Sequence, residues 1–470
     1  MRIMFKKNQI VGLSITGMTR EGNGVGRADG IAVFVPGTAV GDEIECRIVK
    51  VKSSYCYGII ENLITPSETR VEPECPVSRS CGGCVFQHLS YEEECRLKDS
   101  FIRDSFERIG KLSPEYLPFL TCERTGGYRN KAQYPLAFDK GRVLCGFYAR
   151  RSHRVIDHTS CALQPEVFSR IAGRIREFIE EKHIPVYDEV KLTGLVRHIY
   201  LRRGEHSGQI MVCYVVTDLD RGAVFEGLTG RLTGEFRQIA SIMLNENPKN
   251  TNVILGRRQR CIYGSEDISD IMCSNRISIS PLSFYQVNTI QAERLYAAAE
   301  ELAELKAEDT LLDLYCGAGT IGLSMARRVK KLIGVEVIED AVENARRNAL
   351  QNGIDNAEFI CGDAGEAAKL LYERGERPDV VICDPARKGC DRQTLEYMAK
   401  MSPGRIVYIS CDHATCARDC AVLSELGYRT EKVRGVDLFP RTGHVECVAL
   451  LTRDAAGEQA AGKVLPLFDR

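Results

Sequence analysis

The sequence predicts an α/β protein with three parts: a small N-terminal β-barrel, a central α/β domain and a doubly wound, Rossmann-like C-terminal domain. Short strand-like runs separated by glycine turns fill the first 65 residues, and from about residue 280 strands alternate regularly with helices. A glycine-rich turn, Asp313–Gly322, follows the first of these later strands, where parallel sheets bind ligands. The chain of 470 residues is long enough for about three domains of ~150 residues.

Residues 1–66 are predicted to form the barrel. Runs of alternating polarity are separated by turns at Gly22–Gly24, Asp29–Gly30 and Pro36–Gly37. Several short strands with such turns are typical of an OB-like barrel, which often binds nucleic acids. The predicted strands are residues 9–15, 31–36, 42–52 and 57–63.

Residues 67–90 and 124–279 are predicted to form the central α/β domain. Short strands alternate there with a helix over residues 165–181. The other predicted strands of this domain are residues 142–148, 197–202, 209–217 and 239–245.

A helix is predicted to begin at Ser90, because Ser90-Tyr-Glu-Glu93 is a capping-box sequence. It carries Ile102, Phe106 and Ile109 on one face and ends at Gly110. We expect this helix to belong with the C-terminal domain.

The C-terminal domain is assigned residues 91–123 and 280–455, followed by a mobile tail over residues 456–470. Its strands alternate with helices such as residues 338–352, which indicates a parallel sheet with both faces covered. The last two strands follow each other closely and are predicted to pair as an antiparallel hairpin. The predicted strands are residues 310–315, 331–337, 358–361, 379–384, 405–410, 429–437 and 445–451.

The total charge is balanced, with 63 basic and 64 acidic residues, so no overall field indicates a nucleic-acid partner. Residues 121–160 are more basic than the chain as a whole, with eight Lys or Arg and three Asp or Glu. Aromatic residues such as Tyr128 and Tyr134 lie among them. This composition suits phosphate contacts and base stacking, although a solvated basic surface has the same composition.

The 20 cysteines are many for a chain whose first residues, Met1–Lys7, lack the apolar region of a secretory signal. Because no run of about 18 apolar residues is present either, we expect a cytoplasmic protein with reduced thiols and no membrane partner. Clustered cysteines then indicate metal or catalytic sites. Cysteines within apolar runs, such as Cys213, Cys361 and Cys383, are predicted to be core residues.

The turn Gly317-Ala-Gly-Thr-Ile-Gly322 lets a ligand approach the backbone, and Glu336, which ends the next strand, can accept hydrogen bonds from ribose hydroxyls. This pattern fits NAD as well as S-adenosylmethionine. Asp363 and Asp384 end two further strands, where Asp363 is placed to bind an adenine amino group. Asp384-Pro is typical of methyltransferases that act on planar nitrogen or carbon, and it is also a common strand terminator.

Cys411 follows the strand Arg405–Ser410, a position from which a nucleophile can point into a nucleotide pocket. Glu446 lies at the start of the last strand. A buried core cysteine and a solvated acid are the alternatives for these two residues. Five motifs in chain order bear on the choice: Tyr128-Arg-Asn-Lys-Ala-Gln-Tyr-Pro135, Ser283-Phe-Tyr-Gln-Val-Asn288, Asp384-Pro-Ala-Arg-Lys-Gly389, Ser410-Cys-Asp-His-Ala-Thr415 and Gly443-His-Val-Glu446.

On these motifs the chain resembles the RNA uridine-C5 methyltransferases of the TrmA/RumA type over nearly its whole length. The resemblance implies a transferase of EC class 2.1.1 with a Rossmann-like S-adenosylmethionine domain. It implies that the Cys411 thiolate adds to C6 of uracil, which makes C5 nucleophilic, and that Glu446 removes the C5 proton after methyl transfer. Two departures, Ala386 and Tyr285, bear on the shape of the base pocket.

The resemblance assigns Gln286, Tyr315, Glu336 and Asp384 to the cofactor. The glycine turn and the strand-end positions add Gly317 and Asp363 to the expected cofactor contacts. The expected RNA contacts are Arg129, Lys131 and Arg387.

Four cysteines form the remaining pattern: Cys75, Cys81 and Cys84 lie close together, and Cys161 is distant in sequence. Four thiolates suit an iron–sulfur cluster or a structural zinc, and the spacing does not separate the two. The RumA branch carries a 4Fe–4S cluster on such a pattern, so the resemblance favours a 4Fe–4S cluster over zinc.

The barrel resembles a TRAM domain, and with the cysteine pattern it favours 23S ribosomal RNA over transfer RNA as the substrate of a monomeric enzyme. Two other classes of protein share some of these features. A radical S-adenosylmethionine methylthiotransferase needs a C-x3-C-x2-C motif, which the sequence lacks. A non-catalytic RNA-binding protein or chaperone has no need for Cys411 and Glu446 together.

Overall fold

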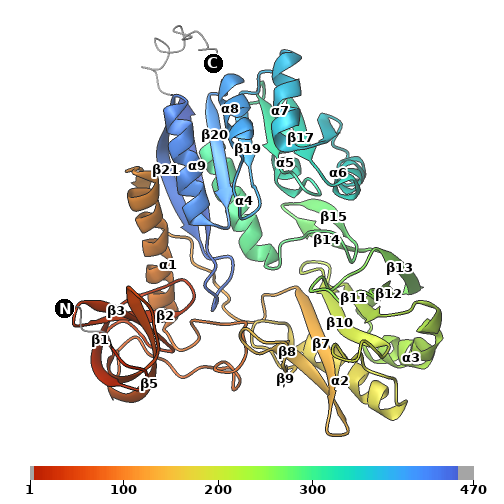
Figure 1. The fold of residues 1–470 in the computed structure, drawn as a ribbon. Coiled ribbons are helices and arrows are strands. Elements are labelled where there is room, and N and C mark those ends of the chain that lie inside the picture. The colour runs from red at the N-terminus through yellow and green to blue at the C-terminus, as the bar shows by residue number, and fades with distance from the viewer. Residues whose placement is uncertain (1–4, 454–470) are drawn as a thin grey trace, which may run out of the picture.

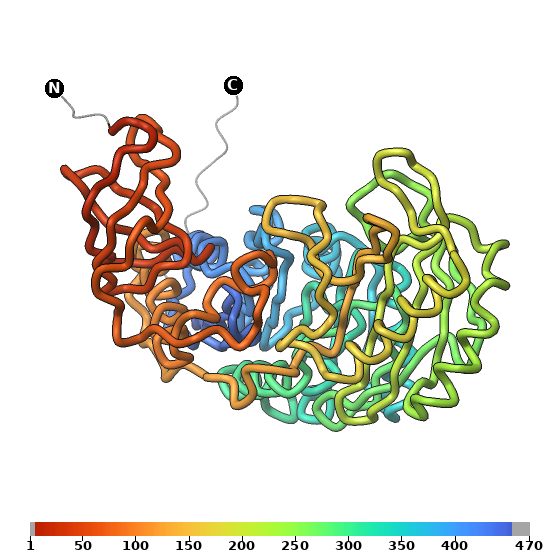
Figure 2. The backbone as a smooth tube through the Cα atoms, turned by 90° about the horizontal axis from the view of Figure 1, so that it is seen from below, coloured from red at the N-terminus to blue at the C-terminus, as the bar shows by residue number. Residues whose placement is uncertain are grey.

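The computed structural model describes residues 5–453, in which a barrel, a central sheet and a C-terminal sheet with its helices form three parts (Figure 1). The predicted tail, residues 456–470, lies outside the described residues. The barrel and the central sheet lie at opposite ends of the molecule, with C-terminal elements between them (Figure 2). Within residues 5–453, no helix is long and apolar enough to cross a membrane.

Five strands close the N-terminal barrel in the order β1-β2-β3-β5-β4, which confirms the predicted barrel. Strand β2 is absent from the strands that the sequence predicts, because two of its six residues are glycines and resemble a turn. An added Cβ at Gly24 would lie 1.9 Å from Thr38 Oγ1, so glycine allows the close approach. The strands are β1 (Ile10–Met18), β2 (Asn23–Ala28), β3 (Ile31–Pro36), β4 (Glu43–Val51) and β5 (Tyr55–Thr65).

Helix α1 (Tyr91–Ser105) begins as predicted, with Ser90 Oγ accepting a hydrogen bond from the Glu93 N–H at 3.3 Å. The prediction that Ile109 shares the buried face is wrong. Residues Phe106–Gly110 form a π-helical turn, whose wider winding turns Ile109 away from that face and leaves it 52% exposed. Ile102 and Phe106 are buried as predicted.

The central sheet has seven strands in the order β13-β12-β11-β10-β7-β8-β9. One face packs against α2 and α3, and the other face shares a hydrophobic core with the ribbon β14–β15 and helix α4. The elements are β7 (Lys131–Asp139), β8 (Arg142–Tyr148), β9 (Val155–Asp157), α2 (Glu166–Glu181), β10 (Val196–Arg203), β11 (Ile210–Val216), α3 (Glu226–Glu235), β12 (Ile239–Glu246), β13 (Arg258–Gly264), β14 (Ile268–Met272) and β15 (Asn275–Ile279).

The C-terminal sheet has eight strands in the order β18-β17-β16-β19-β20-β22-β21-β6. Strands β16 to β20 are parallel, and β22 is antiparallel to both β20 and β21, so the predicted hairpin is confirmed. The strand order reverses between β16 and β19, which is where doubly wound sheets bind ligands.

The strands of this sheet are β6 (Glu115–Tyr116), β16 (Thr310–Leu314), β17 (Lys331–Glu336), β18 (Ala357–Cys361), β19 (Val380–Cys383), β20 (Arg405–Ser410), β21 (Tyr428–Val436) and β22 (Glu446–Arg453). The helices around it are α4 (Thr289–Ala303), α5 (Thr320–Met325), α6 (Glu339–Gln351), α7 (Ala364–Glu373), α8 (Arg392–Lys400) and α9 (His413–Glu425).

Two of the three cysteines predicted to be core residues are buried, and the third is exposed. Cys213 and Cys383 are buried as predicted. Cys361 is exposed, which corrects the prediction: it ends the edge strand β18, where one side of the sheet has no further strand to cover it.

Candidate active site

Three side chains from neighbouring strand ends meet at the carboxyl edge of the C-terminal sheet. Asp384 follows β19, Cys411 follows β20 and Glu446 begins β22, and these strands are adjacent in that order. Ser410 pairs with Cys447 across the two antiparallel strands, so the next positions, Cys411 and Glu446, lie at the same end. Glu446 is buried, whereas Cys411 and Asp384 are half-buried.

The three groups influence one another's protonation. Burial raises the pKa of the Cys411 thiol to about 11, the Glu446 and Asp384 carboxyls add to the rise, and Arg387 opposes it. Burial, followed by the charge of Asp384, holds the pKa of Glu446 well above its usual range. Burial also raises the pKa of Asp384 to about 7. The thiol and the carboxyls therefore lie within electrostatic range, an arrangement that suits covalent catalysis with proton transfer.

The backbone that carries Cys411 is held by the residues beside it. Ser410 Oγ accepts a hydrogen bond from the Asp412 N–H at 3.1 Å and donates one to the Asp412 carbonyl at 3.0 Å. Asp412 in turn caps α9 by accepting from the N–H groups of Ala414 and Thr415, each at 3.1 Å. The motif thus places Cys411 rigidly between a strand end and a helix N-terminus.

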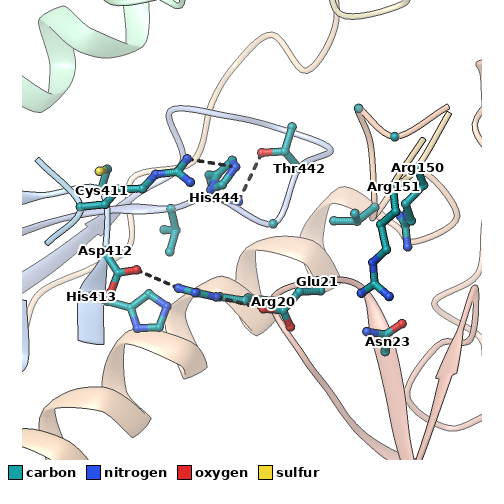
Figure 3. A pocket seen from close by; sticks show the side chains of 16 residues that line it. Arg20, Glu21, Asn23, Arg150, Arg151, Cys411, Asp412, His413, Thr442 and His444 are labelled. Carbon is teal, nitrogen blue, oxygen red and sulfur yellow. Dashed lines mark hydrogen bonds and ion pairs between the residues drawn. The ribbon is translucent and has the colours of Figure 1, made fainter. Parts of the chain in front are cut away.

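Cys411 lines a cavity of about 360 Å³ (Figure 3). Arg387 also lines it and donates a hydrogen bond to His444 Nε2 at 3.4 Å. Burial and then the Arg387 charge lower the pKa of His444 to about 4, so the imidazole is neutral and can accept this bond. The remaining walls come from four segments: Arg20–Asn23 of the barrel, Gly82–Val85, the β8–β9 turn at Arg150–Arg151, and Thr442–Val445. The sequence marks residues 121–160 as a basic stretch and the barrel as a nucleic-acid-binding type, but it does not place Arg20, Arg150 or Arg151 beside Cys411, because these residues are far from Cys411 in the chain.

The glycine turn after β16 has the conformation that a nucleotide ligand requires. Gly317 has a φ of +55° and open space around an added Cβ, and Gly319, with a φ of +79°, precedes the first residue of α5. Glu336 accepts hydrogen bonds from the Gly317 N–H at 3.1 Å and the Ile338 N–H at 2.9 Å. Glu336 is therefore fixed beside the turn, as the sequence predicts.

Asp313 is a site residue that the sequence reasoning missed. It is buried, and its Oδ2 accepts a hydrogen bond from the Gly322 N–H at 2.8 Å. Its Oδ1 has no hydrogen-bond partner among residues 5–453. Burial raises its pKa to about 7, and the charges of Asp384 and Glu336 add to this effect. Three carboxyl groups at adjacent strand ends, one with a free buried oxygen, suit a ligand that carries positive charge, such as the sulfonium of S-adenosylmethionine.

The other predicted cofactor residues lie around this edge in different environments. Asp363 is exposed and caps α7 by accepting from the Gly365 N–H at 3.0 Å. Gln286 is buried just before α4, and its backbone carbonyl accepts a hydrogen bond from Asn130 Nδ2 at 2.8 Å. Tyr315 packs against the core beneath α8, and burial raises its pKa.

Tyr285, one of the two departures from the family motif, is buried and does not line the cavity at Cys411. Its hydroxyl donates a hydrogen bond to Asp270 Oδ2 at 2.9 Å within the core shared by β14 and α4. The extra hydroxyl is thus satisfied internally, and this departure does not change the cavity.

Of the predicted RNA contacts, only Arg387 lines the cavity. Arg129 precedes β7, and its Nε has no hydrogen-bond partner in the described part of the chain, although its charge reaches His444. Burial lowers the pKa of Lys131 to about 8, and the charges of Arg202 and Arg129 contribute.

The four cysteines that are predicted to bind a cluster are free thiols. Within residues 5–453, no three His, Cys, Asp or Glu side chains are arranged to hold a metal ion. The donor chemistry is suitable nevertheless. Burial and then the charge of Cys161 raise the pKa of Cys84 to about 12, and Cys84 Sγ accepts a hydrogen bond from Gln87 Nε2 at 3.3 Å. Cys81 Sγ accepts one from the Gly83 N–H at 3.4 Å. Burial and, to a smaller extent, the charge of Cys75 raise the pKa of Cys81, and burial with the charges of Cys81 and Cys75 raises the pKa of Cys161.

Comparison with known proteins gives consistent matches. Residues 267–454 match the family described as tRNA (Uracil-5-)-methyltransferase, and residues 5–60 match the TRAM domain. An uncharacterized RNA methyltransferase of Clostridium tetani is 43% identical over 450 residues, which cover 96% of this chain and 98% of that protein. An uncharacterized RNA methyltransferase of Halalkalibacterium halodurans is 41% identical over 446 residues, which cover 95% of this chain and 97% of that protein. The crystal structure of Pyrococcus abyssi tRNA (uracil-54, C5)-methyltransferase in complex with S-adenosyl-L-homocysteine is similar with a TM-score of 0.75 and 29% identity, covering 94% of this chain and 100% of that one.

Proposed function

We propose a specific reaction for this chain, which belongs to the S-adenosylmethionine-dependent RNA (uracil-5-)-methyltransferase family. It methylates uridine C5 in large-subunit (23S) ribosomal RNA through a covalent bond from Cys411. The observation that carries the proposal is the meeting of Cys411, Glu446 and Asp384 at adjacent strand ends, with Cys411 lining a cavity. The N-terminal TRAM barrel and the four-cysteine pattern support ribosomal RNA as the substrate.

Each proposed step uses a residue of this site. The Arg387 guanidinium, which lowers the pKa of the thiol, favours loss of the Cys411 proton to solvent. The thiolate then forms a bond to C6 of uracil, and the C5–C6 double-bond electrons move toward O4 as an enolate. S-adenosylmethionine would supply the methyl group that C5 attacks, and the methyl–sulfur bond would break with its electrons staying on sulfur, which gives S-adenosylhomocysteine. The Glu446 carboxylate takes the C5 proton, the double bond re-forms, and the C6–sulfur bond breaks to release Cys411.

For the cofactor we propose a site that runs from the glycine turn to Asp384. Asp313 adds to this site a negative charge that the sequence did not reveal. The acidic strand ends favour a cationic sulfur over the neutral sulfur of the product. The proposed contacts are Gln286, Tyr315, Gly317, Glu336, Asp363 and Asp384.

Paired variants test the assigned roles. Cys411→Ala is expected to form neither adduct nor methylated RNA, because the first bond cannot form. Glu446→Gln keeps the thiol and the cofactor site but cannot remove the C5 proton, so it is expected to accumulate a covalent protein–RNA complex with a methylated uracil. Denaturing gels and mass spectrometry of the digested complex measure both outcomes. Normal turnover by Glu446→Gln, or methylation by Cys411→Ala, would rule out the mechanism.

Transfer RNA is the second candidate substrate, because the Pyrococcus abyssi neighbour is named for uridine 54 of tRNA. Mapping 5-methyluridine in ribosomal and transfer RNA from a deletion strain separates the two. We expect the modification to disappear from 23S rRNA and to remain in tRNA. The reverse result would favour tRNA.

A further inference from the structure

Four arginines line the cavity at Cys411, but their surroundings differ. Two carboxylates, Glu21 and Asp412, line the same cavity, and both form ion pairs with Arg20, at 3.1 and 2.9 Å. Within residues 5–453, Arg150 and Arg151 form no ion pair with a carboxylate, and both are exposed. One cavity therefore holds one arginine that is paired with carboxylates and two arginines that are not (Figure 3).

We propose that these arginines have two separate tasks: Arg150 and Arg151 bind the RNA phosphates that flank the target uridine, whereas Arg20 positions the backbone that carries Cys411. The proposal rests on the proposed function, because it takes RNA as the ligand of the cavity. It makes the N-terminal barrel part of the active site as well as an RNA-binding module.

The position of Arg150 and Arg151 suits a phosphate contact. They lie in the turn between β8 and β9, and Arg151 points across the cavity toward Asn23 of the barrel (Figure 3). Arg150 donates a hydrogen bond to the backbone carbonyl of Cys84 at 3.4 Å, which joins this turn to the segment Gly82–Val85 that forms a neighbouring wall. Enzymes that act on a base take it out of the stack into a pocket, so the phosphates on either side remain at the rim. Free guanidinium groups at such a rim can bind phosphate oxygens.

Arg20 has a different environment. Arg20 Nη1 pairs with Asp412 Oδ2, and each group stabilises the charge of the other, so the pKa of Arg20 rises and that of Asp412 falls. Asp412 directly follows Cys411 and caps α9, so the pair connects the barrel to the nucleophile's loop.

The packing around Arg20 is also tight. An added Cβ at Gly443 would lie 1.8 Å from the Arg20 carbonyl oxygen, and one at Gly22 would lie 2.7 Å from Val85 Cβ. The barrel turn is therefore seated against the loop that leads to Glu446, and Arg20 cannot move to a phosphate without leaving Asp412.

The test compares full-length variants. Binding of a labelled, uridine-rich, 20-nucleotide RNA is measured between 50 and 200 mM KCl, and steady-state methylation is measured on unmodified 23S rRNA transcribed in vitro. The double variant Arg150→Ala/Arg151→Ala is expected to flatten the slope of log K against log salt by about 1.4, since each lost phosphate contact contributes ~0.7 on single strands. Its KM should rise about tenfold or more, the effect of losing hydrogen bonds to charged groups, with a much smaller change in kcat.

Arg20→Ala is expected to leave the salt slope unchanged and to lower kcat about tenfold at saturating RNA, the effect of one lost charge-assisted bond. It should also slow adduct formation on RNA containing 5-fluorouridine, which traps the adduct because C5 carries no removable proton after methylation. Arg20→Lys should restore most of kcat. Asp412→Asn removes the same pair from the other side, so combining it with Arg20→Ala should add little further loss.

Arg142→Ala serves as the matched control, because Arg142 is also exposed and lies at the other end of β8, a strand about 20 Å long. We expect it to change neither the salt slope nor kcat. An unchanged slope in the double variant, or a flattened slope in Arg20→Ala, would overturn the division of tasks, as would failure of Arg20→Lys to restore kcat. If the parent protein methylates no RNA, the proposed function fails, while the salt slopes still decide whether Arg150 and Arg151 contact RNA.

Discussion

Asp384 and Asp313 show at the scale of single residues how burial prepares a site for a cation. Both carboxyls have pKa values of about 7, raised mainly by burial. Below that pH they are neutral, and above it they are charged in a poorly solvated edge of the sheet. A positively charged ligand is therefore attracted more strongly as the pH rises through about 7.

Cofactor affinity should follow this titration. We expect binding of S-adenosylmethionine to strengthen by about tenfold or more from pH 5.5 to 8, because one favourable charge interaction of this kind is worth at least ~1.4 kcal/mol. S-adenosylhomocysteine, whose sulfur is neutral, should gain much less. Isothermal titration calorimetry measures both, and Asp384→Asn should reduce the difference. An equal pH dependence for the two ligands would contradict this account.

At the scale of single residues, the local sequence predicts features that depend on neighbouring positions, and it does not predict features that depend on distant strands. The Ser90 cap could be predicted because its hydrogen bond joins residues within one helical turn, and the position of Cys411 could be predicted because it directly follows an apolar strand. Asp313 was missed because its role depends on carboxyls that reach it from other strands. Ile109 was misplaced because a π-turn changes the helical period, and residue order does not reveal that change.

At the scale of elements, helix α1 is tied to the loop that leads to Glu446. Lys98 Nζ is fully buried and donates to Glu94 Oε1 at 2.7 Å, Asp437 Oδ1 at 2.7 Å and the Phe439 carbonyl at 3.1 Å. Asp437 directly follows β21. This buried network explains why a helix far ahead in the sequence belongs with the C-terminal sheet.

Removing the buried Lys98 ammonium group should destabilise the folded protein strongly. Lys98→Ala is expected to lower the free energy of unfolding by about 3–5 kcal/mol, because two buried carboxylates lose their partner. Arg103→Ala removes a partly exposed pair with Asp99 on the same helix and should cost less than ~1 kcal/mol. Urea denaturation of the two variants measures the contrast. Similar losses in both would show that the network contributes no more than a surface pair.

At the scale of the whole molecule, the four cysteines come from two segments that only the folded chain brings near each other. We propose that Cys75, Cys81, Cys84 and Cys161 bind a 4Fe–4S cluster, supported by the four free thiols and by the hydrogen bonds to two of the sulfurs. Protein purified without oxygen should then contain about four iron atoms per chain and absorb broadly in visible light. Cys84→Ala should lose the iron, whereas Cys361→Ala, an exposed cysteine elsewhere, should retain it. Stoichiometric zinc without iron would replace this assignment, and no metal would remove it.

The sequence by itself determined the parts of this protein that depend on local order. Alternating polarity and glycine turns predicted most strands of the three sheets, and the order of short motifs identified Cys411, Glu446 and the acidic strand ends. Tertiary structure alone decided which distant segments share the cavity. Arg20 and Asp412 are 392 positions apart, and their ion pair leaves no periodic pattern in the chain. Burial and charge at the site are properties of the assembled surfaces, so the pKa values and the two kinds of arginine emerge only when the barrel, the β8–β9 turn and the C-terminal sheet pack together.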